Sequence, residues 1–527
     1  MIHSSRRRAH TRPILGHGPD NSWTRARHGR VLRMPRPAVV RYVGLAGSLL
    51  LAVAAYRGGA RSPWHPTMTP TTIFHGTNGV LTPLSWLLGT VLLIGAWWAG
   101  RRSVPSARWA YVTAGLWALP LLFFLPLGSY DAYSYACQGW QQAAGADPYA
   151  GGVDLLGCPW RDAVAPTWLS SPAPYGPVFL VLAAAAAKLG GSLTGTLIAL
   201  RGIALLGVAL IAVSLPSLAR RSGVPLSRAV WLALACPLVP IHLISGAHND
   251  AVMVGFVVAA LALAADRRLL LAGLLFGLAV GVKATAIVAV PFAVLLWTTA
   301  EERRTLVVDS APPERGWGRL GKLGQLANDH ALLRASGELL LGVAGVLVAV
   351  TIVSGRGLGW VTGLEGSGVS VQWTSPSTAV GMVFRLAGLD AVPVTRVIGI
   401  GALAVVLVWL WWRARRAEPL LYAGLALAAT VVLAPVFHPW YAIWPLAVLA
   451  ATVRRETLWL VVPPAIAAAL CLPDGYNLAL ATKSQGAILM TVFLIVVIGK
   501  ALYDSKNRHR RVVGVGHDPD RLSRRDA

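Results

Sequence analysis

The stretch ISGAHNDAVMVGFVVAALALAA, residues 244–265, determines the kind of fold that this chain can adopt. It is apolar from Ala251 onward, whereas His248, Asn249 and Asp250 stand side by side at the edge of the apolar run. Strands of a membrane barrel alternate between polar and apolar residues, so a solid apolar run indicates a membrane helix. The polar triplet beside it needs a separate explanation.

The composition extends this interpretation to the whole chain. Of 527 residues, 55% are hydrophobic and 13% are charged, whereas about a quarter of residues are charged in soluble domains. Apolar stretches recur from Val39 almost to Leu502, and roughly 17–25 apolar residues cross a bilayer core of about 30 Å as a helix. We therefore predict an all-α, multi-pass bundle of about 13–14 transmembrane helices in the plasma membrane.

The placement of arginines predicts the orientation of these helices. The predicted spans are residues 39–56, 80–99, 110–127, 196–218, 229–245, 251–265, 269–282, 286–299, 339–354, 394–412, 420–435, 441–452, 458–472 and 486–502. With both termini cytoplasmic, arginine pairs such as Arg101/Arg102 and Arg454/Arg455 fall on the cytoplasmic side, as the positive-inside rule requires. Residues 175–190 must then not cross, and we expect a short helix there at the outer surface, as also at 379–387.

Five segments follow from this arrangement. Residues 39–300 form an N-terminal catalytic membrane module with an outer loop at 128–175, and residues 338–502 form a C-terminal membrane module. Residues 301–337 resemble a cytoplasmic linker, and residues 1–38 and 503–527 are basic cytoplasmic tails that we expect to be disordered. The net charge of +25 lies mostly in the tails and short loops, which favours solvated, topology-setting segments over nucleic-acid binding.

Little of the chain is left for a soluble domain, and this limits the chemistry. No P-loop and no glycine-rich dinucleotide fingerprint occurs in the sequence. A substrate is therefore expected from the bilayer or from the outer space.

The polar residues that remain gather on the predicted outer side. Asp131 directly follows a span, and helical spacing would place it on one face with Tyr135 and Gln138 along the membrane surface. Its carboxylate has two interpretations that stay open, a helix N-cap and a catalytic group.

Two cations, Lys283 and Arg201, lie at the outer ends of predicted spans. Lys283 has only apolar neighbours in sequence, and a charge inside a span costs about 2.5–3.5 kcal/mol, so it needs a partner or a function. A lysine near the interface can also extend to water, which is the alternative. Arg201 is ambiguous in the same way. Trp440 lies at the outer end of a later predicted span, where tryptophan is common at the membrane–water interface. This preference does not explain the neighbouring His438.

The polar triplet has three interpretations. His248, Asn249 and Asp250 face a hydrated cavity in the first. In the second, His248 and Asp250 bind a metal ion, although residues i and i+2 of a helix diverge and no third ligand is evident. In the third, the triplet only caps the helix that begins near Ala251.

These motifs together resemble the actinobacterial polyprenol-phosphomannose-dependent α-1,6-mannosyltransferases, which belong to the GT-C class of membrane glycosyltransferases. The resemblance covers roughly residues 130–444 and rests on an ordered set of motifs: Ser129-Tyr130-Asp131 with Tyr133-Ser134-Tyr135, Asp147-Pro148-Tyr149, Ala173-Pro174-Tyr175-Gly176-Pro177, Gly246-Ala247-His248-Asn249-Asp250, Val282-Lys283 and Phe437-His438-Pro439-Trp440-Tyr441. It implies an inverting enzyme that moves mannose from a polyprenyl-phosphate-mannose lipid to an α-1,6-mannan glycolipid of the lipomannan or lipoarabinomannan type, at the extracytoplasmic face.

The resemblance also implies roles for single residues. Asp131 corresponds to the general base, with Asp250 as the competing carboxylate, and Lys283, then Arg201, would hold the donor phosphate. The predicted sugar- and acceptor-binding residues are Tyr130, Tyr135, Tyr175, His248, Asn249, Asp250, His438 and Trp440. We assign no metal ligands and no certain cofactor, and a divalent cation stays an open alternative. Another GT-C sugar transferase, and a lipid-linked sugar transporter or flippase, are the alternative functions.

The cysteines allow one further expectation. Cys137 and Cys158 lie in the same outer loop, in an oxidising space, so a disulfide between them is one alternative. Cys236 and Cys471 fall within spans and are expected to be ordinary core residues.

Overall fold

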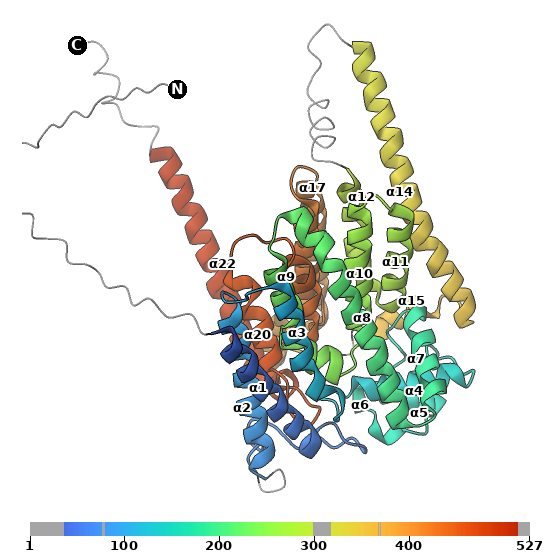
Figure 1. The fold of residues 1–527 in the computed structure, drawn as a ribbon, viewed down its shortest axis with the longest axis vertical. Helices are drawn as coiled ribbons and strands as arrows, with labels where there is room; N and C mark the ends of the chain where they lie inside the picture. Colours follow the sequence, from blue (N-terminus) through green and yellow to red (C-terminus); the bar gives the residue numbers. More distant parts are fainter. Residues whose placement is uncertain (1–35, 76–78, 299–317, 367, 369, 515–527) are drawn as a thin grey trace, which may run out of the picture. The chain divides into compact units, whose positions relative to one another are not determined.

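Helices make up the regular structure in the computed structural model, which describes residues 36–75, 79–298, 318–366, 368 and 370–514. These residues contain no β-strand and a single isolated bridge between Cys471 and Asn477. The prediction of an all-α fold is therefore confirmed (Figure 1). Most of both predicted tails, and residues 301–317 of the predicted linker with the two residues before it, lie outside the described residues.

Long apolar helices form the membrane framework. Among the described residues, six helices are long and apolar enough to cross a membrane. They are α1 (Pro37–Gly58), α2 (Leu81–Gly100), α8 (Leu193–Ser222), α14 (Gly318–Ser354), α17 (Val392–Ala414) and α22 (Lys483–Gly514). The chain is accordingly a polytopic membrane protein.

One predicted span is broken. The apolar run at 229–245 forms α9 (Leu226–Leu234) and the wider-turned helix η3 (Val239–Ser245), which are bent by 59° relative to each other. Pro237 and Pro240 lie at the bend, and a proline lacks the N–H that would continue a helix. If the bent pair crosses as one span, the number of long membrane helices is up to 7.

The remaining apolar helices are shorter than the predicted spans. They are α3 (Ala107–Ala118) with η1 (Leu119–Leu122), α7 (Pro177–Gly190), α10 (Asp250–Ala265), α11 (Leu269–Val282), η4 (Ala284–Ala289) with α12 (Val290–Trp297), α18 (Pro419–Leu433), η6 (Pro439–Ala442) with α19 (Ile443–Leu449), and η7 (Leu458–Leu460) with α20 (Val462–Ala469). A helix such as α10 is roughly 24 Å long, less than a bilayer core of about 30 Å. The total of 13–14 crossings thus stays a prediction, as does the surface position of α7 and of α16 (Pro376–Leu386).

Two helices extend beyond the predicted spans. Residues 318–337 of the predicted linker are helical and continue into α14, and residues 503–514 of the predicted tail are helical and continue α22. Neither stretch contains a proline, and both contain alanine, leucine, lysine or arginine residues that favour helix. A helix can therefore continue beyond its apolar segment as long as the following residues favour helix.

Small residues let neighbouring helices approach closely. A Cβ at Gly89 of α2 would lie 2.8 Å from the backbone oxygen of Gly47 in α1, and a Cβ at Gly273 of α11 would lie 2.2 Å from that of Leu339 in α14. Small residues at such contacts are typical of packed membrane helices. Figure 1 shows both helix pairs side by side, in agreement with their contacts.

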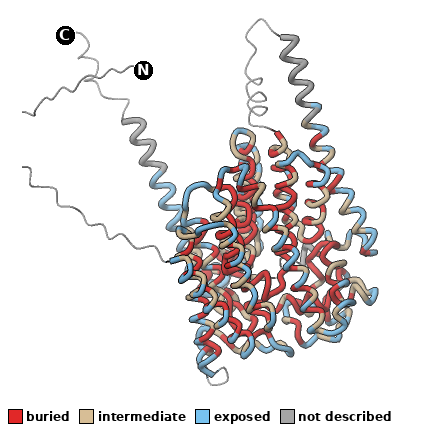
Figure 2. The backbone as a smooth tube through the Cα atoms, in the orientation of Figure 1, coloured by how far each residue is buried: buried red, intermediate tan, exposed pale blue. Residues whose placement is uncertain are grey.

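Burial differs between the two ends of the chain. The most apolar window is 44% buried in α1 and in α2, but 11% buried in α17 and in α22. Figure 2 shows the buried segments concentrated among the central helices, which include α8 to α12. Apolar helices that the rest of the protein leaves uncovered are suited to contact with lipid. The buried central helices can instead hold polar groups away from lipid.

Candidate active site

The helix that carries Asp131 is enclosed by protein. Helix α4 (Asp131–Ala143) confirms the predicted helix, and α5 (Val153–Leu156) and α6 (Pro166–Leu169) follow it in the predicted outer loop. The expected position along a membrane surface is not supported, because Tyr135, Gln138 and the opposite face are all buried. Helix α7 covers α4 so closely that a Cβ at Gly139 would lie 2.3 Å from the oxygen of Ala183.

Asp131 is the first residue of α4, and its carboxylate does not cap the helix. The Ser129 hydroxyl accepts the backbone N–H of Asp131 at 3.0 Å. The carboxylate Oδ1 accepts a hydrogen bond from Trp168 Nε1 at 3.2 Å, and Oδ2 lies 3.8 Å from His248 Nδ1. The carboxylate therefore contacts side chains of other segments. A helix cap would instead accept a backbone N–H of its own helix, so the catalytic interpretation is favoured.

Burial gives this carboxylate an unusual affinity for protons. It raises the pKa of Asp131 from its ordinary value of 3.8 to about 6, opposed by the Trp168 hydrogen bond and the Lys283 cation and assisted by the Asp250 charge. The side chain keeps 14% of its surface exposed. A base whose pKa lies near neutrality is well suited to accept a proton in catalysis.

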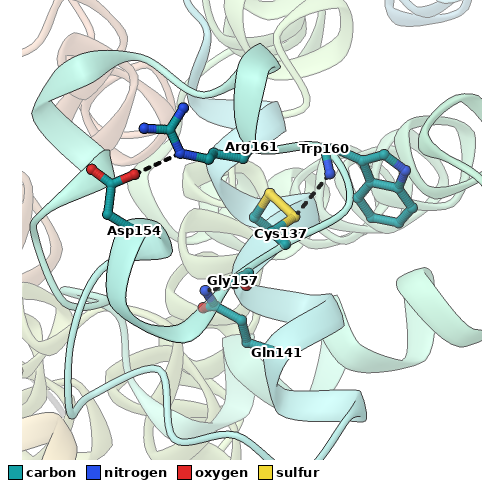
Figure 3. Close-up of a disulfide and its surroundings, with 7 residues drawn as sticks. Cys137, Gln141, Asp154, Gly157, Trp160 and Arg161 are labelled. Carbon is teal, nitrogen blue, oxygen red and sulfur yellow. Dashed lines mark hydrogen bonds and ion pairs between the residues drawn. A yellow bond between two sulfur atoms is a disulfide. The ribbon is translucent and has the colours of Figure 1, made fainter.

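The loop that brings Trp168 to Asp131 is covalently tied to α4. A disulfide joins Cys137 of α4 to Cys158, which confirms the alternative that the loop sequence allowed (Figure 3). Beside it, Gln141 Nε2 donates to the carbonyl of Gly157 at 3.0 Å, also drawn in Figure 3. Trp168 packs in one buried cluster with Cys137, so the loop and the helix are held as a unit.

The polar triplet joins Lys283 in the protein interior. Asp250 is 0% exposed, and its Oδ1 accepts hydrogen bonds from Lys283 Nζ at 2.8 Å and from Trp444 Nε1 at 2.7 Å. The Lys283 ammonium also lies 4.3 Å from the ring centre of Tyr441, within the range of a cation–π contact. Lys283 thus has a carboxylate partner, and the snorkelling alternative is not needed to explain it.

The other interpretations of the triplet find little support. Asn249 occupies the N-cap position of α10 without a side-chain capping bond. Within the described part of the chain, no group of three or more histidine, cysteine, aspartate or glutamate residues could hold a metal ion. A divalent cation that binds together with substrate stays an open alternative.

Stacked rings connect the triplet to the C-terminal half. His248 stacks on Trp440 with ring centres 3.8 Å apart, and His438 stacks on Trp440 at 4.6 Å. On the other side, the Tyr135 hydroxyl lies 3.3 Å from His248 Nδ1, and the Tyr135 ring lies 5.2 Å from that of Tyr175. Five of the predicted sugar-binding residues therefore lie in one group beside Asp131.

Several buried polar atoms of this group lack a protein partner. In the described chain these include His248 Nε2, both side-chain polar atoms of Asn249, Asp250 Oδ2 and, from α4, Ser134 Oγ and Gln138 Oε1. A buried polar atom without a partner costs about 1–3 kcal/mol, so such a concentration is uncommon in a purely structural core. It points to a polar ligand that supplies the missing hydrogen bonds.

Two predicted site residues have other surroundings. The guanidinium of Arg201 donates to the backbone carbonyls of Leu122, Phe124 and Ser245. The Tyr130 hydroxyl accepts the backbone N–H of Arg61 at 3.2 Å, and its side chain lines a cavity of about 410 Å³ together with Asp474. The contacts described for these two residues do not connect them to Asp131 or Lys283, and their predicted roles stay predictions.

Some contacts of the site had no usable signal in the sequence. Trp168 lies in the short helix α6 and Gln372 in an irregular segment, and only the folded chain shows that they reach Asp131 and His438. Gln372 Nε2 lies 3.0 Å from His438 Nδ1. His242, in the bent segment before the triplet, lies 5.5 Å from Trp440 between ring centres. A larger cavity of about 900 Å³ is lined mostly by apolar residues, with Arg415 and Arg416 among them, and contains none of the predicted site residues.

The fold and the site define a polytopic α-helical membrane protein with a buried polar centre made of two carboxylates, a lysine and stacked rings. Residues 41–299 match the family described as "Alpha-(1->6)-mannopyranosyltransferase, N-terminal domain", and residues 374–500 match "MptB C-terminal domain". The chain belongs to the α-(1→6)-mannopyranosyltransferase family and is a mannosyltransferase, as the resemblance in the sequence predicted.

Curated relatives agree with this assignment. The chain is 33% identical to α-(1→6)-mannopyranosyltransferase A of Mycobacterium tuberculosis, over 77% of this chain and 79% of the relative. It is 29% identical to α-(1→6)-mannopyranosyltransferase B of Corynebacterium glutamicum (80% and 74%) and 28% identical to the A enzyme of that organism (75% and 83%). No solved structure matches the chain.

Proposed function

We propose that this mannosyltransferase takes mannose from a polyprenyl-phosphate-mannose lipid and transfers it to an α-1,6-mannan glycolipid of the lipomannan or lipoarabinomannan type. The reaction takes place at the outer face of the plasma membrane, and both termini are cytoplasmic. The family supports mannosyl transfer, and the scarcity of soluble structure supports a donor that arrives through the bilayer. The positive-inside arrangement of the arginines supports the orientation.

The observation that carries the proposal is the pairing of a proton acceptor with a buried cation. Asp131 has a pKa raised to about 6 and a side chain that is partly exposed. Lys283 is close enough to influence that carboxylate electrostatically, and it is held by Asp250 at 2.8 Å. Transfer from a lipid phosphate ester requires a base for the incoming hydroxyl and a positive charge for the departing phosphate.

The reaction balances with these groups. Asp131 accepts the proton of the acceptor 6-hydroxyl while the hydroxyl oxygen forms a bond to C1 of the donor mannose. The bond between C1 and the phosphate oxygen breaks, and the electron pair leaves with the polyprenyl phosphate, whose charge Lys283 stabilises. Attack from the opposite face inverts C1, so a β-linked donor gives an α-mannoside.

The second carboxylate has a different role in this proposal. Asp250 is the competing candidate for the base, but one of its oxygens already accepts hydrogen bonds from Lys283 and Trp444. We therefore assign to Asp250 the orientation of Lys283. Arg201, the second candidate for the phosphate, joins two other backbone segments through its contacts with three carbonyls.

The remaining residues of the group would bind the sugars. His248 and Asn249 have buried polar atoms that lack protein partners, and sugar hydroxyls can satisfy them. Tyr135, Tyr175 and Trp440 supply ring faces, since pyranose rings present C–H groups that pack against aromatic surfaces. His438 would border the acceptor.

Purified protein in lipid nanodiscs, supplied with radiolabelled polyprenyl-phosphate-mannose and a short α-1,6-mannoside, provides the direct test. We expect a longer α-1,6-mannoside, and no product when polyprenyl-phosphate-arabinose or polyprenyl-phosphate-glucose replaces the donor. A parallel reaction with a chelator decides whether a divalent cation takes part. Movement of donor lipid without a new glycosidic bond would instead favour the transporter alternative.

A further inference from the structure

A further cavity adjoins two segments that contact the candidate active site. It has a volume of about 450 Å³ and lies between α6, α16, the start of α22 and the segment around residue 370. Its polar lining consists of Thr167, Ser170, Ser370, Arg385, Lys483 and Ser484. None of the residues that line it is acidic.

Two of its walls are the segments that reach the predicted catalytic group. Thr167 and Ser170 flank Trp168, whose indole donates to Asp131. Across the cavity, Ser370 accepts a hydrogen bond at 2.9 Å from Gln372, whose amide nitrogen also lies 3.0 Å from His438. A ligand in this cavity would therefore be separated from Asp131 and His438 by one layer of side chains.

The proposed phosphate site is built from other residues than those that line the cavity. Asp131 directs Oδ1 toward Trp168 and Oδ2 toward His248. Lys283 lies instead with Asp250, Tyr441 and Trp444, and these residues do not line the cavity. If the donor phosphate binds at Lys283, the Trp168 side is left for the acceptor.

We propose that this cavity binds the part of the acceptor glycan that lies beyond the reacting mannose. The inference rests on the proposed function. The lining fits a neutral saccharide, because serine and threonine hydroxyls and the Lys483 ammonium can bind sugar oxygens, whereas Met382 and Leu480 offer apolar surface to the C–H faces of a pyranose. The charge of Arg385 is balanced by Asp390 at 2.7 Å, which reduces the positive charge that the lining presents to a neutral ligand.

The inference is tested by a substitution that fills the cavity with a tryptophan ring. Ser484 is exposed and lines the cavity, and its neighbour Gln485 is exposed but does not. Ser484→Trp and the matched control Gln485→Trp are compared in nanodiscs by the Kd of an α-1,6-mannotetraose and of an α-1,6-mannobiose. Both variants also carry Asp131→Asn, so that binding is measured without turnover.

We expect Ser484→Trp to weaken mannotetraose binding about tenfold, which corresponds to about 1.4 kcal/mol, and to leave mannobiose binding unchanged. Gln485→Trp should match the parent for both ligands. If Ser484→Trp fails to fold, judged by thermal unfolding, Lys483→Gln takes its place, with an expected loss of about threefold for the longer ligand only.

Equal affinities in all variants would overturn the inference. A rise in donor KM without a change in mannotetraose binding, measured with Asp131 restored, would overturn it too and would assign the cavity to a lipid phosphate. Binding of mannotetraose that depends on Ser484, in a protein that transfers no mannose, would retain the glycan site and refute the proposed function. The two failures are thus distinguishable.

Discussion

Asp131 and Asp250 lie beside the same buried group of aromatic and histidine rings, yet their burial and their hydrogen-bond partners differ. Asp250 is fully buried and accepts short hydrogen bonds from a lysine and a tryptophan. Asp131 is partly exposed, accepts one longer hydrogen bond from Trp168, and lies 3.8 Å from the nearest histidine nitrogen. The lysine therefore neutralises one carboxylate and only influences the other from a distance.

This difference shows how environment can assign roles to identical side chains. A carboxylate that is bound to a cation contributes fixed charge and geometry, whereas a partly desolvated carboxylate without a close cation can take up and release a proton near neutral pH. The assignment of Asp131 as base and Asp250 as positioning residue rests on this contrast, and the following changes test it.

The largest effect is expected from Asp131→Asn. An amide cannot accept the proton, so kcat should fall by about 10³- to 10⁴-fold, while donor binding remains. Initial rates and donor-lipid binding in nanodiscs measure the two effects. Asp154→Asn is the control, because Asp154 lies in the same loop and forms an exposed ion pair with Arg161 that contributes little. Full activity of Asp131→Asn would transfer the base role to Asp250.

The contrast between the carboxylates could be predicted from the sequence only in part. The sequence places both carboxylates at the ends of predicted helices, because each stands beside an apolar run. Their partners were not assigned, because Trp168 follows Asp131 by 37 residues and Lys283 follows Asp250 by 33 residues. No local periodicity connects such pairs, and only the folded chain brings them together.

The same limit applies to the fold. Long apolar runs predicted α1, α2 and α8 well, because a membrane helix is defined by its own composition. The run at 229–245 was predicted as one helix, although Pro237 and Pro240 bend it. Hydrophobicity also does not predict that α14 and α22 continue into polar sequence. In such sequence the helix propensity of the residues determines where the helix begins or ends.

The next effect in size is expected from Lys283→Met. Removal of the ammonium leaves the Asp250 carboxylate buried without its cation, which destabilises a protein by about 3–5 kcal/mol, and activity in the folded fraction should fall about 10²-fold. The double variant Lys283→Met/Asp250→Asn should recover much of the thermal stability but not the activity. Thermal unfolding and initial rates are measured together. Recovery of activity in the double variant would show that Lys283 acts only as a structural partner.

A smaller effect separates the two candidate cations. Arg201→Gln removes donors from three backbone carbonyls in two segments, and we expect a loss of about 1–3 kcal/mol in stability. The donor KM of the folded fraction should stay close to that of the parent protein, in contrast to Lys283→Met. A donor KM that rises as much as in Lys283→Met would restore Arg201 as a phosphate ligand.

The smallest effect is expected from the loss of the hydrogen bond between Trp168 and Asp131. The Trp168 indole donates to the charged carboxylate and so lowers the pKa of Asp131, against the larger effect of burial. Trp168→Phe keeps a ring but removes the donor, so the pKa should rise above its present value of about 6. Since the base acts in its deprotonated form, the acid limb of kcat/KM should move to higher pH.

With a hydrogen bond of about 1 kcal/mol, the rate at pH 6 should fall about threefold, whereas the rate at pH 8 should change little. A pH profile of kcat/KM measures the shift. Trp160→Phe is the matched control, because Trp160 packs in the same loop beside the disulfide and has no described bond to Asp131. An acid limb that stays in place in Trp168→Phe, or a uniform loss at all pH values, would mean that another group titrates. Asp131 would then not be the titrating base, and its hydrogen bond with Trp168 would serve packing alone.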